Sequence, residues 1–202
     1  IENRRLELQE RTIVLAEHTR QILKSAEIVL EAVAEMSDWS RKRPGRGLGI
    51  AYYDGGEWNT HNAQVAEVSV DRATGAITVH HIWNATEAGF PVQPSHVAQQ
   101  IETGILFGLG SALRERITVA NGRVEQSNFH DYPPTRQMTA PRIDIKVLEG
   151  PTQPSGPSES GASLVAASIA NAVRAATGLR MRRLPMLPER VLAAFDHPTR
   201  IG

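Results

Sequence analysis

The sequence of 202 residues contains no cysteine. The chain therefore cannot form a disulfide, an iron–sulfur cluster or a thiolate-ligated zinc site, and it has no thiol nucleophile. Its 22 basic and 22 acidic residues give a formal charge of zero. This balance argues against a nucleic-acid binder held by a general basic field and against a polybasic membrane-surface protein. The longest apolar stretch, residues 105–113, is short and interrupted by glycine, so no membrane-spanning segment is expected.

The composition is that of an ordinary globular chain, with an apolar fraction of 41%. Its length gives room for one large domain or two small ones. The chain begins Ile-Glu-Asn-Arg-Arg without a methionine, and no apolar run follows these charges. We therefore expect no signal peptide in it, and we expect it to be a piece of a longer polypeptide.

Residues 1–43 contain neither glycine nor proline, and their apolar residues recur at roughly helical spacing among charges. This pattern predicts one long helix, or two helices in series, that ends near Trp39 and packs internally or faces a partner. The following residues favour strands at 48–53, 62–70 and 76–83, with a hairpin turn at 71–75.

A further helix is predicted from Ser95, as its N-cap, to about Arg116. Gly104, Gly108 and Gly110 on this helix indicate either tight packing or the close approach of another backbone or a ligand. The remaining elements are predicted to be a strand–turn–strand at 117–124, a strand at 142–148, a helix at 162–177 closed by Gly178, and a short helix at 188–195.

Strands joined by hairpins and mixed with helices predict the α+β class rather than a doubly wound α/β fold. We expect an N-terminal helical segment at 1–43 and a domain at 48–202.

His80 and His81 are neighbours on one predicted strand, so their side chains point to opposite faces and cannot easily share a metal ion. We expect both to be structural, and no metal ligand is assigned in this chain.

The loop at 154–161 places one carboxylate, Glu159, among small residues just before a predicted helix. Such a carboxylate suits an ordinary helix cap or a general base on a preorganised loop. The N–H groups of the same loop could also meet an anionic cofactor. The glycine-rich segment at 45–49 precedes a strand, so it is only weak evidence for nucleotide binding.

Several motifs carry, in their order and spacing, a resemblance to a known family. They are Ala63-Gln-Val-Ala-Glu-Val-Ser-Val-Asp71, Gln100-Ile-Glu-Thr-Gly-Ile-Leu-Phe-Gly-Leu-Gly110, Val124-Glu-Gln-Ser-Asn-Phe-His-Asp-Tyr132, Glu159-Ser-Gly161 and Ala167-Ser-Ile-Ala-Asn-Ala-Val173. From about Gly49 to Pro185 the chain resembles the C-terminal part of the molybdopterin-binding subunit of the xanthine oxidase and aldehyde oxidase family. Within that family it resembles in particular the isoquinoline oxidoreductase branch, in its beta subunit.

The resemblance implies a molybdenum hydroxylase, which inserts water-derived oxygen into a C–H bond of an N-heterocycle or an aldehyde. It assigns Glu159 as the catalytic base toward a molybdenum-bound hydroxyl, and Gln100, Pro157 and Ser158 as cofactor contacts. Ser158 stands where the family has glycine, and Pro157 has no N–H to donate. These departures motivate an alternative, a non-catalytic partner or scaffold module on the same fold. A stand-alone protein with an unrelated small-ligand site is a third hypothesis.

The resemblance also implies partners. A molybdenum–molybdopterin cofactor, expected in its cytosine dinucleotide form, would be shared with a chain that forms the remaining part of the molybdopterin-binding subunit. Because this chain has no cysteine, 2Fe-2S clusters are expected on a separate iron–sulfur subunit. A flavin subunit or a cytochrome is a further candidate partner, and the substrate is expected to be a small molecule.

Overall fold

The computed structural model describes residues 2–56, 60–150, 152–157 and 159–196. Its helices are α1 (Glu2–Met36), α2 (Pro94–Leu113), α3 (Ser160–Ser163), α4 (Val165–Thr177) and α5 (Pro188–Asp196), with a short 3₁₀ helix, η2 (Gln137–Thr139). Its strands are β1 (Gly47–Asp54), β2 (His61–Val70), β3 (Ile77–Glu87), β4 (Val119–Ala120), β5 (Arg123–Val124) and β6 (Arg142–Leu148). This mixture of helices and hairpin strands confirms the predicted α+β class.

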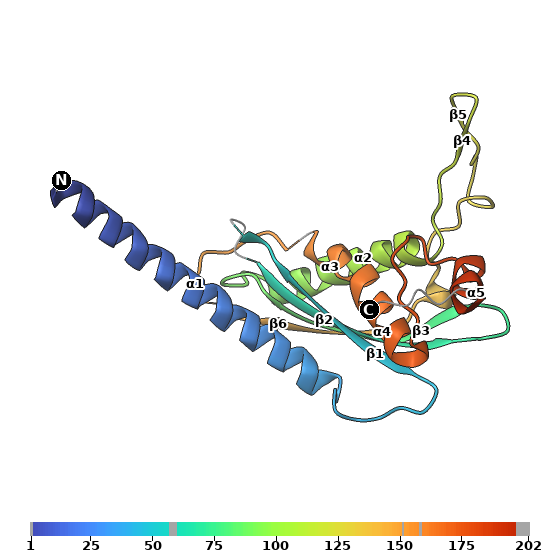
Figure 1. Cartoon of the computed structure of the whole chain (residues 1–202), viewed down its shortest axis with the longest axis horizontal. Coiled ribbons are helices and arrows are strands. Elements are labelled where there is room, and N and C mark those ends of the chain that lie inside the picture. Colours follow the sequence, from blue (N-terminus) through green and yellow to red (C-terminus); the bar gives the residue numbers. More distant parts are fainter. Residues whose placement is uncertain (1, 57–59, 151, 158, 197–202) are drawn as a thin grey trace.

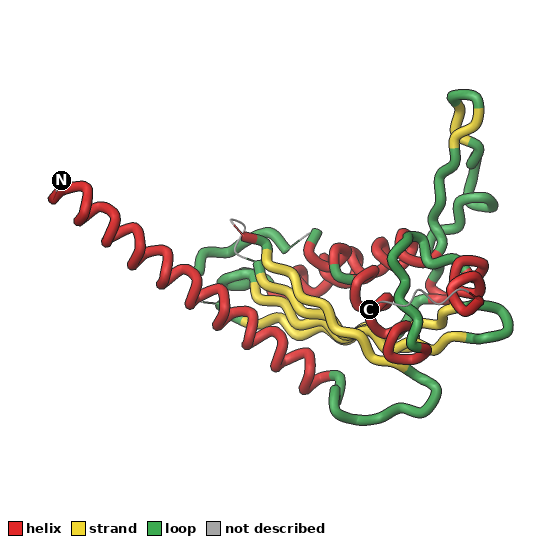
Figure 2. The backbone as a smooth tube through the Cα atoms, viewed as in Figure 1, coloured by secondary structure: helices red, strands yellow, loops and turns green. Residues whose placement is uncertain are grey.

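The strands of the main sheet, yellow in Figure 2, are arranged in the order β1-β2-β3-β6. The first three are antiparallel neighbours, whereas β6 runs parallel to β3. The predicted hairpin turn between β2 and β3 is confirmed, because Asp71 Oδ1 accepts the Ala73 N–H at 2.8 Å and Gly75 adopts a φ of +75°. The strand predicted at 76–83 continues to Glu87, because β6 supplies a pairing partner along residues 81–87.

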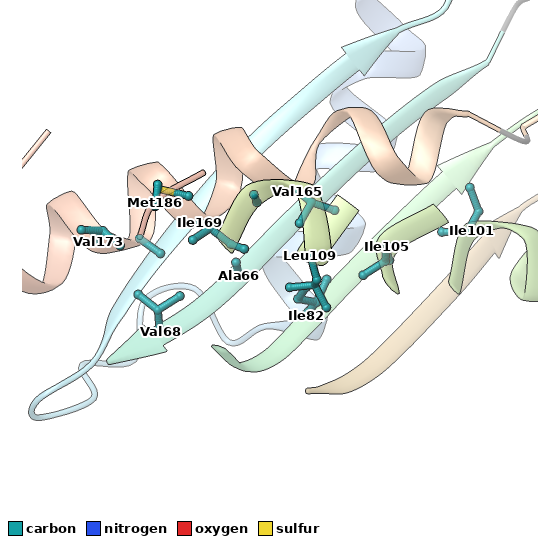
Figure 3. Packing of buried hydrophobic residues seen from close by; sticks show 12 residues of the cluster. Ala66, Val68, Ile82, Ile101, Ile105, Leu109, Val165, Ile169, Val173 and Met186 are labelled. Atoms are coloured by element: carbon teal, nitrogen blue, oxygen red, sulfur yellow. The ribbon is translucent and has the colours of Figure 1, made fainter. Parts of the chain in front are cut away.

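Helices cover both faces of the sheet (Figure 1). One face packs against α2 and α4 and buries the larger apolar cluster (Figure 3), which includes Ala66, Val68, Ile82, Ile101, Ile105, Leu109, Val165, Ile169, Val173 and Met186. The other face packs against α1 and buries a smaller cluster of Val29, Ala32, Val33, Ala63, Val65, Trp83 and Ala85. The alternation of side chains along β2 and β3 divides their apolar residues between these two clusters.

The first helix, α1, is one continuous element of 35 residues that ends at Met36, so of the two predicted alternatives the single long helix is the one observed. Its C-terminal part packs on the sheet, where Val29 and Val33 are fully buried. Its N-terminal part projects away from the sheet (Figure 1), and Ile13, Val14 and Leu15 are 68%, 68% and 70% exposed. The helix therefore carries apolar surface that the described part of the chain does not cover.

The glycine-rich segment at 45–49 leads into β1, where glycine permits close packing. A Cβ atom on Gly49 would lie 2.1 Å from Ala172 N and 2.2 Å from Ser168 O, both in the backbone of α4. The same helix is fixed to the strand by Asn171, whose Nδ2 donates to Ile50 O at 2.9 Å. The backbone of α4 thus lies directly on β1 because this position has no side chain.

The glycines of α2 face two kinds of neighbour. A Cβ on Gly104 would lie 3.1 Å from Ala162 N, and one on Gly108 would lie 2.9 Å from Ala162 O. These two glycines therefore admit the backbone of α3, which confirms the predicted close approach. Gly110 instead makes room for the Glu115 carboxylate, since a Cβ there would lie 1.9 Å from its Oε1.

Two predicted helix boundaries are wrong. Ser95 does not cap α2: Gln93 is the N-cap, with φ −138° and ψ 92°, and Pro94 is the first helical residue. Proline disfavours the helical conformation in the residue before it and is tolerated at the first helical position, so the helix begins there. The helix ends at Leu113 rather than near 116, because the chain turns at Arg114 with φ −140°.

The helix predicted at 162–177 begins earlier and consists of two consecutive pieces, α3 and α4, which meet at Leu164. Its predicted C-terminal glycine is confirmed, because Gly178 has a φ of +83° and donates its N–H to Arg174 O at 2.8 Å. The predicted last helix is also confirmed as α5.

Strands β4 and β5 form a small arm that projects from the body of the molecule (Figure 1). Its tip is the predicted Asn-Gly turn, in which Asn121 and Gly122 have φ values of +49° and +75°. Ile117, Val119 and Phe129 on the arm are 55%, 65% and 70% exposed. Across the described residues, no helix is both long enough and apolar enough to cross a membrane.

Candidate functional site

The predicted catalytic loop contains a tight turn around Glu159. Pro157 O accepts two hydrogen bonds from Ser160, one from its backbone N at 3.2 Å and one from its Oγ at 2.7 Å. Glu159 has φ −91° and ψ −15°, values typical of the third residue of a type I turn. Ser158 lies outside the described residues. The hydrogen bonds between Pro157 and Ser160 therefore enclose the backbone of Glu159 in the turn.

Glu159 occupies the N-cap position of α3 and its residue is exposed. Its carbonyl oxygen accepts the Ala162 N–H at 3.2 Å. In the part of the chain that the structure describes, however, its side chain makes no capping hydrogen bond. The carboxylate therefore does not fill the first of its two predicted roles, that of a helix cap. The capping contact at this position comes from the backbone carbonyl of Glu159.

Buried polar side chains connect the candidate loop to the sheet. Asn84 Nδ2 donates to Asn62 Oδ1 at 2.7 Å, and Asn62 Nδ2 donates to Ser160 Oγ at 3.1 Å. Both asparagines are fully buried, and Ser160 is 4% exposed. Hydrogen bonds in such surroundings are strong and directional, because water does not compete for the same groups. The loop therefore rests on a polar end of an otherwise apolar sheet face.

Close backbone contact joins the candidate loop to α2. A Cβ on Gly161 would lie 2.6 Å from Ile101 O, so the two segments touch through backbone atoms. Gln100 immediately precedes Ile101 and is exposed. Because Gln100 immediately precedes Ile101 and Glu159 stands two residues before Gly161, this contact brings the segments that carry Gln100 and Glu159 together, although 59 positions separate the two residues in the sequence.

A second loop supports the same end of the sheet. Backbone hydrogen bonds join residues 88–90 to residues 150, 152 and 155: Gly150 N donates to Gly89 O, Phe90 N to Thr152 O and Ser155 N to Ala88 O, each at 3.0 Å. Glu87, at the end of β3, is buried, and its Oε1 accepts the Gly89 N–H at 2.8 Å. These bonds tie the segment before Pro157 to the end of β3, which limits its freedom to move.

The opposite face of this sheet end carries a tyrosine–histidine pair. Tyr52 Oη and His61 Nδ1 lie 2.9 Å apart, and Asp54 Oδ1 lies 3.8 Å from the same histidine nitrogen. Burial, assisted by the nearby Asp54 and Glu87 carboxylates, raises the pKa of Tyr52 to about 12. The phenol therefore stays protonated at neutral pH and can donate its hydrogen bond to the imidazole.

The two adjacent histidines on β3 have separate partners. His80 Nε2 lies 2.8 Å from Ser69 Oγ, and His81 Nε2 lies 2.8 Å from Asp144 Oδ2. His81 also stacks on Trp83 with ring centroids 3.8 Å apart. Desolvation lowers the pKa of His81, although its hydrogen bond to Asp144 acts in the opposite direction. These contacts agree with the expected structural role.

A hollow of about 500 Å³ with a mixed apolar and polar lining lies elsewhere, lined among others by Leu109, Leu113, Met138 and Met186. Leu109 and Leu113 belong to the C-terminal end of α2, whereas Gln100 stands near its N-terminal end. At 1.5 Å per residue, Leu109 is roughly 13 Å along the helix from Gln100. The hollow is thus separate from the candidate loop.

Sequence reasoning missed Asn62, Asn84 and Ser160 as components of the site. One signal was available: β2 and β3 carry amides at positions 62, 64 and 84 on the face that elsewhere presents Ala66, Val68 and Ile82. Polar residues at these alternating positions indicate a buried hydrogen-bonded cluster. Their partner on the distant loop could not be identified from the pattern.

Comparison with known proteins identifies the family. Residues 2–141 match the molybdopterin cofactor-binding domain family, and the chain belongs to that family. The matched range contains Gln100 and ends before the Glu159 loop. The resemblance inferred from the sequence motifs is confirmed.

Curated relatives of this chain are longer proteins. The isoquinoline 1-oxidoreductase beta subunit of Brevundimonas diminuta is 40% identical over 175 residues, which are 85% of this chain and 22% of that protein. One subunit of the nicotinate dehydrogenase of Pseudomonas putida is 33% identical over 83% of this chain and 16% of its own length. The chain therefore spans about a fifth of the length of these relatives.

Solved structures share the fold. The aldehyde oxidoreductase of Desulfovibrio gigas is 30% identical, with a TM-score of 0.60 over 68% of this chain and 15% of that chain. Quinoline 2-oxidoreductase of Pseudomonas putida 86 has a TM-score of 0.65 at 24% identity, over 68% of this chain and 19% of that chain. The latter likeness concerns the fold alone.

Proposed function

We propose that this chain is a piece of a molybdenum hydroxylase that supplies the catalytic glutamate and part of the molybdopterin site. The reaction would insert water-derived oxygen into a C–H bond of an N-heterocycle or an aldehyde. The observation that carries the proposal is the backbone contact of Gly161 with Ile101, which brings the Glu159 loop beside Gln100. Relatives named for isoquinoline and nicotinate support the substrate class.

The residues where the Glu159 loop meets α2 fit an organic cofactor. The exposed Gln100 amide can both donate and accept hydrogen bonds, as a pterin edge requires. Among the described residues, no group of three or more His, Cys, Asp or Glu side chains could hold a metal ion. A metal beside Glu159 would therefore be held by the cofactor rather than by this part of the chain.

We assign the cofactor contacts to Gln100 and to the Pro157 and Ser158 segment, with the cytosine dinucleotide form of molybdopterin as the proposed ligand. When bound, the cofactor supplies the oxidising metal centre and the oxygen that is transferred. Glu159 accepts a proton on a carboxylate oxygen as the general base. Its backbone is fixed by the turn and its residue is exposed, so the carboxylate is accessible to a reacting group.

Apolar surface on two projecting elements supports a partner chain. Val14 on α1 and Phe129 on the β4–β5 arm are 68% and 70% exposed, and exposed apolar patches mark protein interfaces. We propose that the segment 1–43 and the arm contact the remaining part of the molybdopterin-binding subunit. Since this chain has no cysteine, the 2Fe-2S clusters are proposed on an iron–sulfur subunit, with a flavin subunit or a cytochrome as acceptor.

The test is Glu159→Gln in the assembled complex, with isoquinoline and benzaldehyde as probe substrates. Loss of a general base should lower turnover about 10²- to 10⁴-fold while molybdenum content stays constant. Glu189→Gln is the matched control, because Glu189 is also exposed and lies in the first turn of a helix, α5. Near-wild-type turnover in Glu159→Gln would refute the base assignment. A complex that binds this chain but turns over neither probe would favour the scaffold alternative.

A further inference from the structure

Two hydrogen-bonded relays with the same design connect the sheet to the C-terminal helices. In the first, Asn62 Nδ2 donates to Ser160 Oγ at 3.1 Å, and that hydroxyl donates to Pro157 O at 2.7 Å. In the second, Gln64 Nε2 donates to Ser168 Oγ at 2.9 Å, and that hydroxyl donates to Val165 O at 3.1 Å. In both, an amide on β2 reaches a serine that binds the carbonyl three residues before it.

We propose that the first relay positions the catalytic loop, with Asn62 and Ser160 acting on Glu159 through the turn between Pro157 and Ser160. This inference rests on the proposed function, because it presumes that Glu159 is the base. Neither Asn62 nor Ser160 touches the reacting atoms, so both are positioning residues. Their effect reaches Glu159 through the backbone of Ser160, which follows it directly, and through the hydrogen bonds from Ser160 to Pro157 O.

The two relays differ in how firmly the accepting carbonyl is held without the serine hydroxyl. Val165 O belongs to the regular helix α4, so its position is fixed by the helix whether or not Ser168 binds it. Pro157 O lies in the loop before α3, where Ser160 holds it through Oγ at 2.7 Å and N at 3.2 Å. Removing the hydroxyl would leave the turn closed by the longer bond, with Glu159 as one of its central residues.

The first relay extends further into the sheet than the second. Asn84 on β3 donates to Asn62 Oδ1 at 2.7 Å, which fixes the orientation of the Asn62 amide and directs its Nδ2 to Ser160. The two asparagines are 0% exposed. Burying amides costs free energy unless they are bonded, so a chain of this kind defines one geometry for the loop that it reaches.

Catalysis is sensitive to such geometry, since a 1 Å misplacement of a group can cost about 10²-fold in rate. A turn that loses one of two closing bonds should shift Glu159 by a fraction of that distance. We therefore expect Ser160→Ala to lower kcat about tenfold, with little change in KM and with molybdenum retained. Ser168→Ala removes the equivalent hydroxyl from a helix and should leave kcat unchanged.

The experiment compares Ser160→Ala, Ser168→Ala and Ser160→Thr in the assembled complex. Its readouts are kcat and KM with isoquinoline or benzaldehyde, molybdenum content, and hydrogen exchange of the peptide covering residues 155–164. The proposal predicts a kcat defect and faster exchange in Ser160→Ala only, and recovery of most of the lost turnover in Ser160→Thr, which keeps the hydroxyl. Hydrogen exchange tests the loop independently of activity.

Equal kcat and equal exchange in the two alanine variants would overturn the proposal. An assembly defect in Ser160→Ala that Ser168→Ala lacks would also overturn it, because the role of the hydroxyl would then be structural. The parallel Glu159→Gln variant separates the two ideas. If Glu159→Gln stays active, the proposed function fails; if it is inactive while Ser160→Ala behaves as Ser168→Ala does, the positioning role alone fails.

Discussion

Gly161→Ala tests the contact that brings the two candidate side chains together. The added Cβ would lie 2.6 Å from Ile101 O and 3.2 Å from Ile101 Cα, both backbone atoms of α2. Ordinary van der Waals contact begins near 3.4 Å, so α2 and α3 must separate by about 0.8 Å. Neither neighbour is the flexible end of a side chain, so the strain cannot be relieved by a rotamer change.

The expected magnitude follows from this overlap. Overpacking of a well-packed core typically costs about 1–3 kcal/mol. For a chain of this size each kcal/mol lowers Tm by about 2–4 °C, so Gly161→Ala should lower Tm by roughly 2–12 °C. Because the displaced segment follows Glu159 directly, the same variant should also lower the turnover of the assembled complex.

Gly156→Ala is the matched control in the same loop. A Cβ on Gly156 meets nothing within 4 Å, and the substitution removes conformational freedom from the unfolded chain. It should leave Tm unchanged or raise it slightly. Thermal unfolding followed by circular dichroism measures both variants. Equal Tm values for Gly161→Ala and Gly156→Ala would refute the close contact between α2 and α3.

Three further outcomes are expected. Gly49→Ala should lower Tm at least as much as Gly161→Ala does, because its Cβ would lie 2.1 Å from backbone of α4. Val33→Ala, on the buried face of α1, should cost about 2 kcal/mol in chemical denaturation, whereas Val14→Ala, at a position 68% exposed on the same helix, should leave stability unchanged and weaken partner association instead. Backbone hydrogen bonds from Asn128 and its neighbour lower the pKa of Asp131 from 3.8 to about 2. The ionised carboxylate therefore stabilises the arm at neutral pH, and this contribution should disappear as pH falls from about 4 to 2. The amide resonance of Asn128 should titrate with a midpoint near pH 2; a midpoint at 3.8 would contradict the bond.

Elements encoded by local patterns were predicted well. The strand at 142–148 has the predicted bounds, the hairpin turn at 71–75 is confirmed, and Gly178 ends α4 as expected. The N-cap of α2 was predicted wrongly, because Ser95 is a good capping residue and the effect of Pro94 on the residue before it outweighs that preference.

Glu159 and Gln100 were proposed as site residues from the resemblance, and their roles stay predictions. The supporting residues Asn62 and Ser160 were not found, since their bond joins positions 98 residues apart. A polar residue on a strand has the same local pattern whether its partner is water or a distant serine. The identity of that partner is decided only when α3 packs against the sheet.

By itself, the amino-acid sequence determined which segments form helices, strands and turns, and it carried the family resemblance, because each depends on neighbouring residues or on motifs in order. Only the tertiary structure decided that the Gly161 backbone touches α2, and that buried asparagines support the loop. Such contacts depend on which distant segments meet after folding. The Gly161 contact forms because this residue has no side chain, and the asparagine contact forms because a buried amide needs a hydrogen-bond partner.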